Sequence, residues 1–157
     1  MKIVNGESLK SNHKYFLECA KIHTNEIPEG FLPSLGLDFL SNLYEFFSIS
    51  KFSFLLLAIE DSRVIGFVAV SLHTKSLFRQ FLFTQSCKKI FKIPMRVFSK
   101  VFISKIIELL KYPFKINKGD KDFISNSEIF NFCVDSAHQG KGVGQLLFSE
   151  AVDKLSD

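Results

Sequence analysis

The chain has 157 residues, 46% of them hydrophobic and 23% charged, which suits one folded domain with a substantial core. Its three cysteines (Cys19, Cys87 and Cys133) are widely spaced and odd in number, which argues against a disulfide framework, and no Cys/His cluster indicates a metal site. The first residues contain no apolar leader, and no uncharged apolar run approaches the ~18 residues of a membrane span. We therefore expect a single cytoplasmic domain over residues 1–157.

The net charge of +4 is unevenly distributed along the chain. Residues 75–118 contain eleven Lys and Arg residues and a single acid, Glu108, so this segment carries +10 and the rest of the chain carries −6 by difference. Such segregation favours an anionic partner, and a solvated basic helix face is the alternative. No nucleic-acid-binding motif accompanies the charge, so we expect no nucleic acid partner. A peripheral contact with an anionic membrane surface stays open beside packing on the domain.

The first half of the chain predicts a strand, two helices and a β-hairpin. Residues 2–4 favour a short strand, and apolar residues cluster on one side of a helix over residues 12–24. After a loop rich in Pro and Gly, Ser34 is placed to cap a second helix that runs to about residue 47. Two largely apolar strands follow at 52–60 and 63–72. Their apolar character predicts that both lie at the centre of a sheet.

A helical basic insertion is predicted at about residues 75–118. Residues 75–111 favour two helices that are broken at Pro94 and end before Pro113. The second of these helices has basic residues on one face and apolar residues on the other, so it is strongly amphipathic. Residues 115–127 then predict a loop that leads into the next strand.

The glycine-rich stretch that follows is the strongest functional signal in the sequence. It lies between a strand predicted at 129–134 and a helix predicted at 143–155. Gly140, Gly142 and Gly144 let successive backbone N–H groups converge on one anion, and the new helix adds the positive end of its dipole. A dinucleotide fingerprint would need its third glycine at Gln145, and no P-loop sequence for a nucleoside triphosphate occurs. We expect a phosphate-binding loop, with a plain tight turn as the alternative.

This loop resembles that of a known enzyme family. The run from Gln139 to Gly144, QGKGVG between a strand and a helix, resembles the Q/R-x-x-G-x-G/A acyl-CoA loop of the GNAT superfamily of N-acetyltransferases. The order of predicted elements matches the first two thirds of a GNAT domain. Residues 26–47 also resemble a bacterial subgroup that carries long basic insertions before its fourth strand. The resemblance implies an α/β fold with a mixed central sheet flanked by helices.

The resemblance also implies a cofactor and a binding site for it. The cofactor would be acetyl-CoA, with its pyrophosphate on the backbone of residues 139–144 and its pantetheine arm along the edge of the preceding strand. A backbone N–H near Cys133 or Val134 would stabilise the thioester oxyanion. The implied cofactor-binding residues are Cys133, Val134, Gln139, Gly140, Lys141, Gly142, Val143 and Gly144.

For the acceptor side, the resemblance implies a small primary amine, with an amino sugar as one candidate. The amine must lose a proton before it attacks the thioester. Glu128 lies eleven residues before Gln139, as the catalytic base does in one GNAT branch, although a glutamate that starts a strand can simply face solvent. The implied wall of the acceptor pocket is the loop that contains Glu29, Phe31 and Leu32.

The match stops before the end of the family's domain. A GNAT domain continues after its phosphate-binding helix with further strands and a helix, so the resemblance implies a domain truncated after that helix. The strand at 128–134 would then be an unpaired sheet edge that is open to self-association. The alternative function is a catalytically inactive fragment that binds a partner through its basic amphipathic helices. Detectable CoA binding would separate the two.

Overall fold

The computed structural model describes residues 1–83 and 127–156, which form a mixed α/β structure around one sheet. The strands lie in the order β1-β2-β3-β4, and all three neighbouring pairs are antiparallel. The apolar strands β2 and β3 are central, as their sequences predict. A mixed sheet was expected, but the described strands contain no parallel pair. The strands are β1 (Lys2–Asn5), β2 (Ser53–Glu60), β3 (Arg63–Ser71) and β4 (Glu128–Val134).

A two-residue turn explains why β2 and β3 pair antiparallel. Asp61 and Ser62 both have positive φ, 48° and 61°, which is the signature of a type I′ hairpin turn. The pairing shifts by one residue between Ala58 and Ile59, which leaves Ile65 of β3 as the extra residue of a bulge. The predicted hairpin is thus confirmed to within one residue at its ends.

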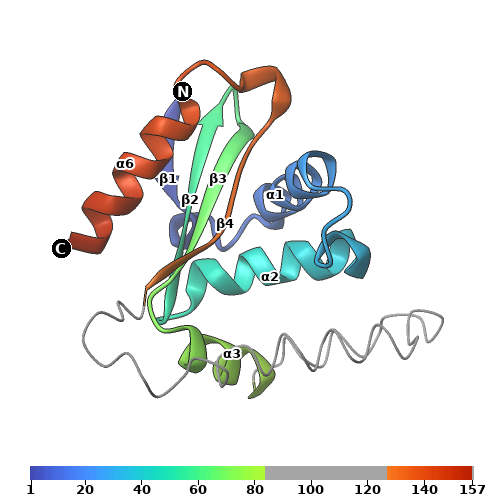
Figure 1. Cartoon of the computed structure of the whole chain (residues 1–157), viewed down its shortest axis with the longest axis vertical. Coiled ribbons are helices and arrows are strands. Elements are labelled where there is room, and N and C mark those ends of the chain that lie inside the picture. Colours follow the sequence, from blue (N-terminus) through green and yellow to red (C-terminus); the bar gives the residue numbers. More distant parts are fainter. Residues whose placement is uncertain (84–126, 157) are drawn as a thin grey trace.

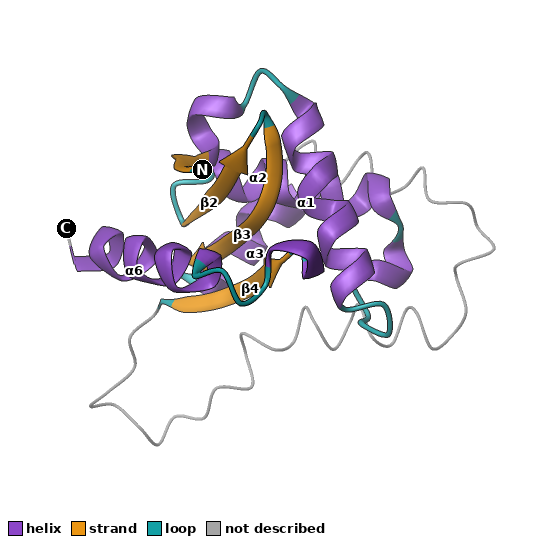
Figure 2. Cartoon of the chain, turned by 90° about the horizontal axis from the view of Figure 1, so that it is seen from above, coloured by secondary structure: helices purple, strands orange, loops and turns teal. Residues whose placement is uncertain are grey.

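Helices cover both faces of the sheet. Figures 1 and 2 show α1 and α2 on one face and α6 on the other. One buried apolar cluster lies between the sheet and the α1–α2 pair, and a second joins β2 and β3 to Val143, Leu147 and Ala151 of α6. The α-helices are α1 (His13–Glu26), α2 (Leu37–Ile49), α3 (Thr74–Phe83) and α6 (Val143–Ser156), and the short 3₁₀ helices are η1 (Gly6–Leu9), η2 (Pro33–Leu35) and η5 (Ser136–His138).

The two predicted N-terminal helices are present, but the start of the second was predicted wrongly. Asn12 caps α1 by accepting a hydrogen bond from the Lys14 N–H at 3.2 Å. Ser34 does not cap α2. Its hydroxyl donates back to the carbonyl of Phe31, before η2, at 2.6 Å, and Gly36 (φ 92°) precedes α2 instead. Pro favours the first position of a helical turn, so Pro33 starts a separate short helix at this place.

Part of the basic insertion is described, as α3. The predicted second amphipathic helix, the break at Pro94 and nearly all of the loop predicted at 115–127 lie outside the described residues. None of the helices within 1–83 and 127–156 combines the length and the apolar character that a bilayer crossing requires.

Candidate functional site

The edge of β4 is the first part of the candidate site. The Asp135 N–H donates to the Ile65 carbonyl at 3.0 Å, and the register pairs Cys133 with Phe67. Residues of an antiparallel strand alternate between bonding to the neighbour and pointing away from it. The N–H of Cys133 is therefore directed at β3, while those of Phe132 and Val134 face the other edge. No described strand pairs with that edge.

The loop between β4 and α6 is the second part. The first backbone N–H groups of the loop are hydrogen-bonded. The Ser136 N–H donates to the Glu26 carboxylate at 3.0 Å, and the Ala137 N–H donates to the Asp135 carboxylate at 2.9 Å. Those of His138 and Gln139 bond to carbonyls within the turn. Within the described residues, the six N–H groups from residue 140 to residue 145 make no close, well-aligned hydrogen bond, although residues 139–142 form a turn. Leu146 is the next to donate, to the Gly142 carbonyl. Such a run of weakly bonded donors at a helix start fits an anion.

The glycines of the loop shape this run of donors. Gly140 and Gly142 have φ of 72° and 80°, a region that disfavours most side chains. A Cβ on either would meet nothing within 4 Å, so the backbone conformation, and not lack of space, is what favours glycine at these two positions. Gly144 has a different role. A Cβ there would lie 3.3 Å from the Phe132 ring, so this glycine lets the start of α6 lie close against β4.

Two side chains of the loop make hydrogen bonds within the protein. The Gln139 amide donates to Glu26 at 3.0 Å and to the Val134 carbonyl at 2.9 Å, so it braces the loop against α1 and the end of β4. The Lys141 ammonium donates to the Ala137 carbonyl at 2.9 Å, and two further N–H donors remain on it. Sequence reasoning assigned Gln139 to the cofactor and missed Glu26, since nothing local marks that contact.

Glu128 lies at the other end of β4. It is six residues from Val134, or roughly 20 Å along an extended strand. Its carboxylate accepts a hydrogen bond of 2.7 Å from the Thr74 hydroxyl at the start of α3. Thr74 is also 3.1 Å from the Ser71 hydroxyl. Glu128 is half-buried and held by this contact, so it is not simply a solvent-facing residue.

The predicted acceptor wall follows the C-terminus of α1. Glu29 is exposed in the loop between α1 and η2, whereas Phe31 and Leu32 are half-buried and Leu32 packs against the core. Glu26, which binds the glycine loop, ends α1 directly before this segment. The chain thus connects the acceptor-wall segment to the glycine loop through one helix end.

A buried polar cluster lies between α1, α2 and β4, and the sequence did not reveal it. The Asn131 amide nitrogen is 3.0 Å from the Tyr44 oxygen and 3.0 Å from Nδ1 of His23. The Tyr44 hydroxyl oxygen is also 2.5 Å from Nδ1 of His23. Because Asn131 donates to Tyr44, the Tyr44 hydroxyl is left to donate to His23. The cluster fixes the middle of β4 to both helices.

Burial keeps the titratable groups of this region neutral. It lowers the pKa of His23 to about 4 and raises that of Tyr44. The pKa of Cys133 rises to about 11, first through burial and then through the charge of Glu26. Since the thiolate is the reactive form, Cys133 is poorly suited to be a nucleophile. Within the described residues, no His, Cys, Asp and Glu side chains group in a way that could hold a metal.

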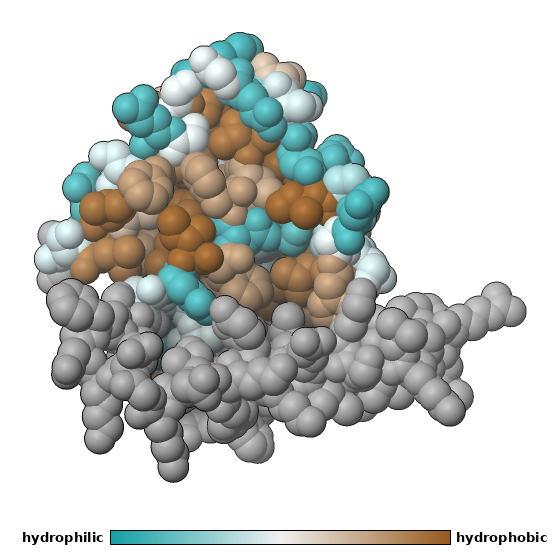
Figure 3. Space-filling model, viewed as in Figure 1, coloured by the Kyte–Doolittle hydropathy of each residue, from teal (hydrophilic) through white to brown (hydrophobic). Residues whose placement is uncertain are grey.

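Hydrophobic residues surround the β4 edge. Figure 3 shows brown surface gathered across the middle of the face that carries β4 in Figure 1. Ile129 and Phe132 of β4 remain 46% and 39% exposed, and Phe148 of α6 is 50% exposed. An apolar surface beside a strand edge that pairs with no described strand suits an extended amide-containing ligand, because such a ligand can bury methylene groups and form hydrogen bonds with the strand.

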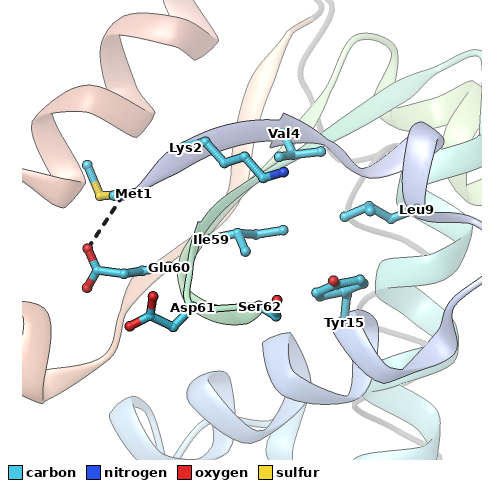
Figure 4. Close-up of a pocket in the computed structure, with 9 residues that line it drawn as sticks. All are labelled: Met1, Lys2, Val4, Leu9, Tyr15, Ile59, Glu60, Asp61 and Ser62. Atoms are coloured by element: carbon cyan, nitrogen blue, oxygen red, sulfur yellow. Dashed lines mark ion pairs between the residues drawn. The ribbon is translucent and has the colours of Figure 1, made fainter.

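A separate hollow of about 300 Å³ lies at the opposite edge of the sheet from β4, between β1, the hairpin turn and the start of α1. Figure 4 shows its lining, in which the Met1 ammonium is 3.6 Å from Glu60. None of the residues predicted for catalysis, cofactor or acceptor binding lines it. The candidate site therefore stays at β4 and the glycine loop.

Comparison with known proteins identifies no relative of this chain. The sequence matches no protein-family model and no curated protein, and the chain matches no solved structure.

Proposed function

We propose that this chain is an N-acetyltransferase of the GNAT type, which moves an acetyl group from acetyl-CoA to the primary amine of a small molecule such as an amino sugar. The observation that carries the proposal is the run of six backbone N–H groups, residues 140–145, that make no close, well-aligned hydrogen bond within the described residues. The run follows directly from a strand whose outer edge pairs with no described strand. A phosphate-bearing ligand with amide groups in an extended arm uses both features.

The residues fit this cofactor in two places. The glycine loop offers backbone donors, and the space beside Gly140 and Gly142 is open among the described residues, which suits a pyrophosphate. The edge-facing N–H groups of Phe132 and Val134 suit the amide carbonyls of the pantetheine arm. The Val134 carbonyl already accepts from Gln139, so of the Val134 backbone groups the N–H is the one left for the ligand.

Chemically, the cofactor supplies an activated acetyl thioester. Glu128, held by the Thr74 hydroxyl, is the proposed base. It lies roughly 13 Å along the strand from Phe132 and roughly 20 Å from Val134, so it takes the proton of the acceptor ammonium through bridging water molecules and not by direct contact. The oxyanion donor is the N–H of Val134 or Phe132, because the N–H of Cys133 is directed at β3. Glu29, Phe31 and Leu32 are the proposed acceptor-side residues.

A calorimetric titration with acetyl-CoA tests the proposal. The wild-type chain is compared with Gly142→Asp and Gly142→Asn, which are nearly the same size and are both tolerated at positive φ. They differ in charge, so repulsion of the pyrophosphate separates them. We expect Gly142→Asp to bind at least about tenfold more weakly than Gly142→Asn. Equal binding by the two variants contradicts a pyrophosphate at this loop, and no binding by the folded wild type favours the non-catalytic alternative.

A further inference from the structure

Glu26 makes an unusual pair of contacts for an acidic residue beside a candidate anion site. One carboxylate oxygen accepts the Ser136 N–H at 3.0 Å, and the other accepts the Gln139 side-chain amide at 3.0 Å. Both donors belong to the turn that leads into the weakly bonded N–H groups of residues 140–145. The partners are 110 and 113 residues away in sequence, so this contact joins α1 to the loop across the fold.

The contact determines which donors are left for a ligand. Glu26 satisfies the Ser136 N–H, and Asp135 satisfies the next one at Ala137. Gln139, held by Glu26, also closes on the Val134 carbonyl at 2.9 Å. These hydrogen bonds fix the conformation of the turn from Asp135 to Gln139. They therefore also fix where the N–H groups of residues 140–145, which follow the turn, are placed.

We propose that Glu26 is a positioning residue that holds the glycine loop in its anion-binding shape from the end of α1. This rests on the proposed function, because the anion is taken to be the pyrophosphate of acetyl-CoA. Since Glu26 directly precedes the acceptor-wall segment, the same residue connects the two halves of the proposed site.

Two effects of removing Glu26 oppose each other. Loss of a negative charge near the loop strengthens anion binding, whereas loss of the two hydrogen bonds releases the loop and weakens binding. Glu26→Gln removes the charge as Glu26→Ala does, but its amide keeps one of the two acceptor oxygens, so one of the two hydrogen bonds can remain. If positioning dominates, Glu26→Ala weakens binding more than Glu26→Gln does.

The experiment measures calorimetric affinity for acetyl-CoA and for S-acetylpantetheine, which lacks the pyrophosphate. We expect Glu26→Ala to lower the acetyl-CoA affinity about three- to tenfold and to leave the S-acetylpantetheine affinity unchanged. Glu26→Gln, which can keep one of the two bonds, should bind acetyl-CoA more tightly than Glu26→Ala. Glu150→Ala, the loss of an exposed carboxylate on α6, is the matched control.

Three results overturn the inference: Glu26→Ala binds acetyl-CoA as tightly as wild type, it binds more tightly, or it loses affinity for both ligands equally. Amide hydrogen exchange of residues 136–145 without ligand is the second readout, and we expect faster exchange in Glu26→Ala. A wild-type chain that binds no acetyl-CoA overturns the proposed function, and the exchange result alone then decides whether Glu26 holds the loop.

Discussion

Single residues already show where this fold departs from local preference. Within the part of the chain that the structure describes, Asp61 and Ser62 are the non-glycine residues with positive φ. Left-handed backbone costs an ordinary L-residue roughly 1–2 kcal/mol. Asp tolerates it better than Ser, because its short side chain can bond locally. Ser62, at the second position of the type I′ turn that sets the register of β2 and β3, is therefore poorly suited to its backbone conformation.

Ser62→Gly should stabilise the protein by about 0.5–1 kcal/mol. Relief of roughly 1–2 kcal/mol of strain outweighs the ~0.5–1 kcal/mol of extra backbone entropy that glycine loses on folding. Urea unfolding measures the change. Ser149→Gly in the exposed part of α6 is the contrast, since glycine in a helix interior should destabilise by a similar amount. A destabilised Ser62→Gly would contradict the strain argument.

His23 predicts a pH dependence of stability. Its pKa is about 4 in the folded chain against 6.5 without the fold, because burial disfavours the charged ring. The unfolded chain therefore binds more protons between these values, and stability falls as the pH is lowered from about 6.5 towards 4. The full shift corresponds to about 3 kcal/mol.

Urea unfolding of wild type and His23→Gln at pH 7 and pH 4.5 measures this effect. Gln can still accept from Tyr44 but does not titrate, so the variant should lose less stability on acidification than wild type. The difference between the two proteins isolates His23 from the carboxylates, which titrate in both. Equal losses would show that His23 takes up its proton without cost.

At the scale of elements, α1 organises the site. Along one helix, Glu18 accepts the Val64 N–H of the β3 bulge at 2.8 Å, His23 contacts Asn131, and Glu26 holds the glycine loop. The Gln139 and Asn131 partners of α1 are 113 and 108 residues away in sequence. Three polar contacts from one helix thus fix the bulge, the edge strand and the loop relative to one another.

These contacts mark the boundary of what the sequence could predict. The hairpin and the strand-glycine-helix unit were predicted because their signals lie within a few neighbouring residues. The start of α2 was wrong because Pro33 and Gly36 outweighed Ser34, a competition that a preference for caps does not resolve. The clusters around His23 and Glu26 could not be predicted, since their members meet only after the helices pack on the sheet.

For the whole molecule, the helices on the two faces of the sheet bury unequal amounts of apolar side chain against it. The α1–α2 face buries large aromatic side chains, among them Phe16, Tyr44 and Phe47. α6 buries Val143, Leu147 and Ala151, and most of its other side chains are exposed. Stability within a protein varies with such contact density, so segments with few buried contacts open at lower free energy. The part of the candidate site on α6 therefore lies in the layer with the lower local stability.

Native-state hydrogen exchange should show α6 opening before α1 and α2. Leu147 is fully buried against β2 and β3, so Leu147→Ala should cost about 2–5 kcal/mol. If α6 opens as a separate unit, the variant speeds exchange in residues 143–156 more than in α1 and α2, and it weakens acetyl-CoA binding. Leu40→Ala, at a fully buried position on the other face, is the control and should speed exchange throughout. Uniform acceleration by Leu147→Ala would instead mean that both layers unfold as one unit, and that the glycine loop is as stable as the core.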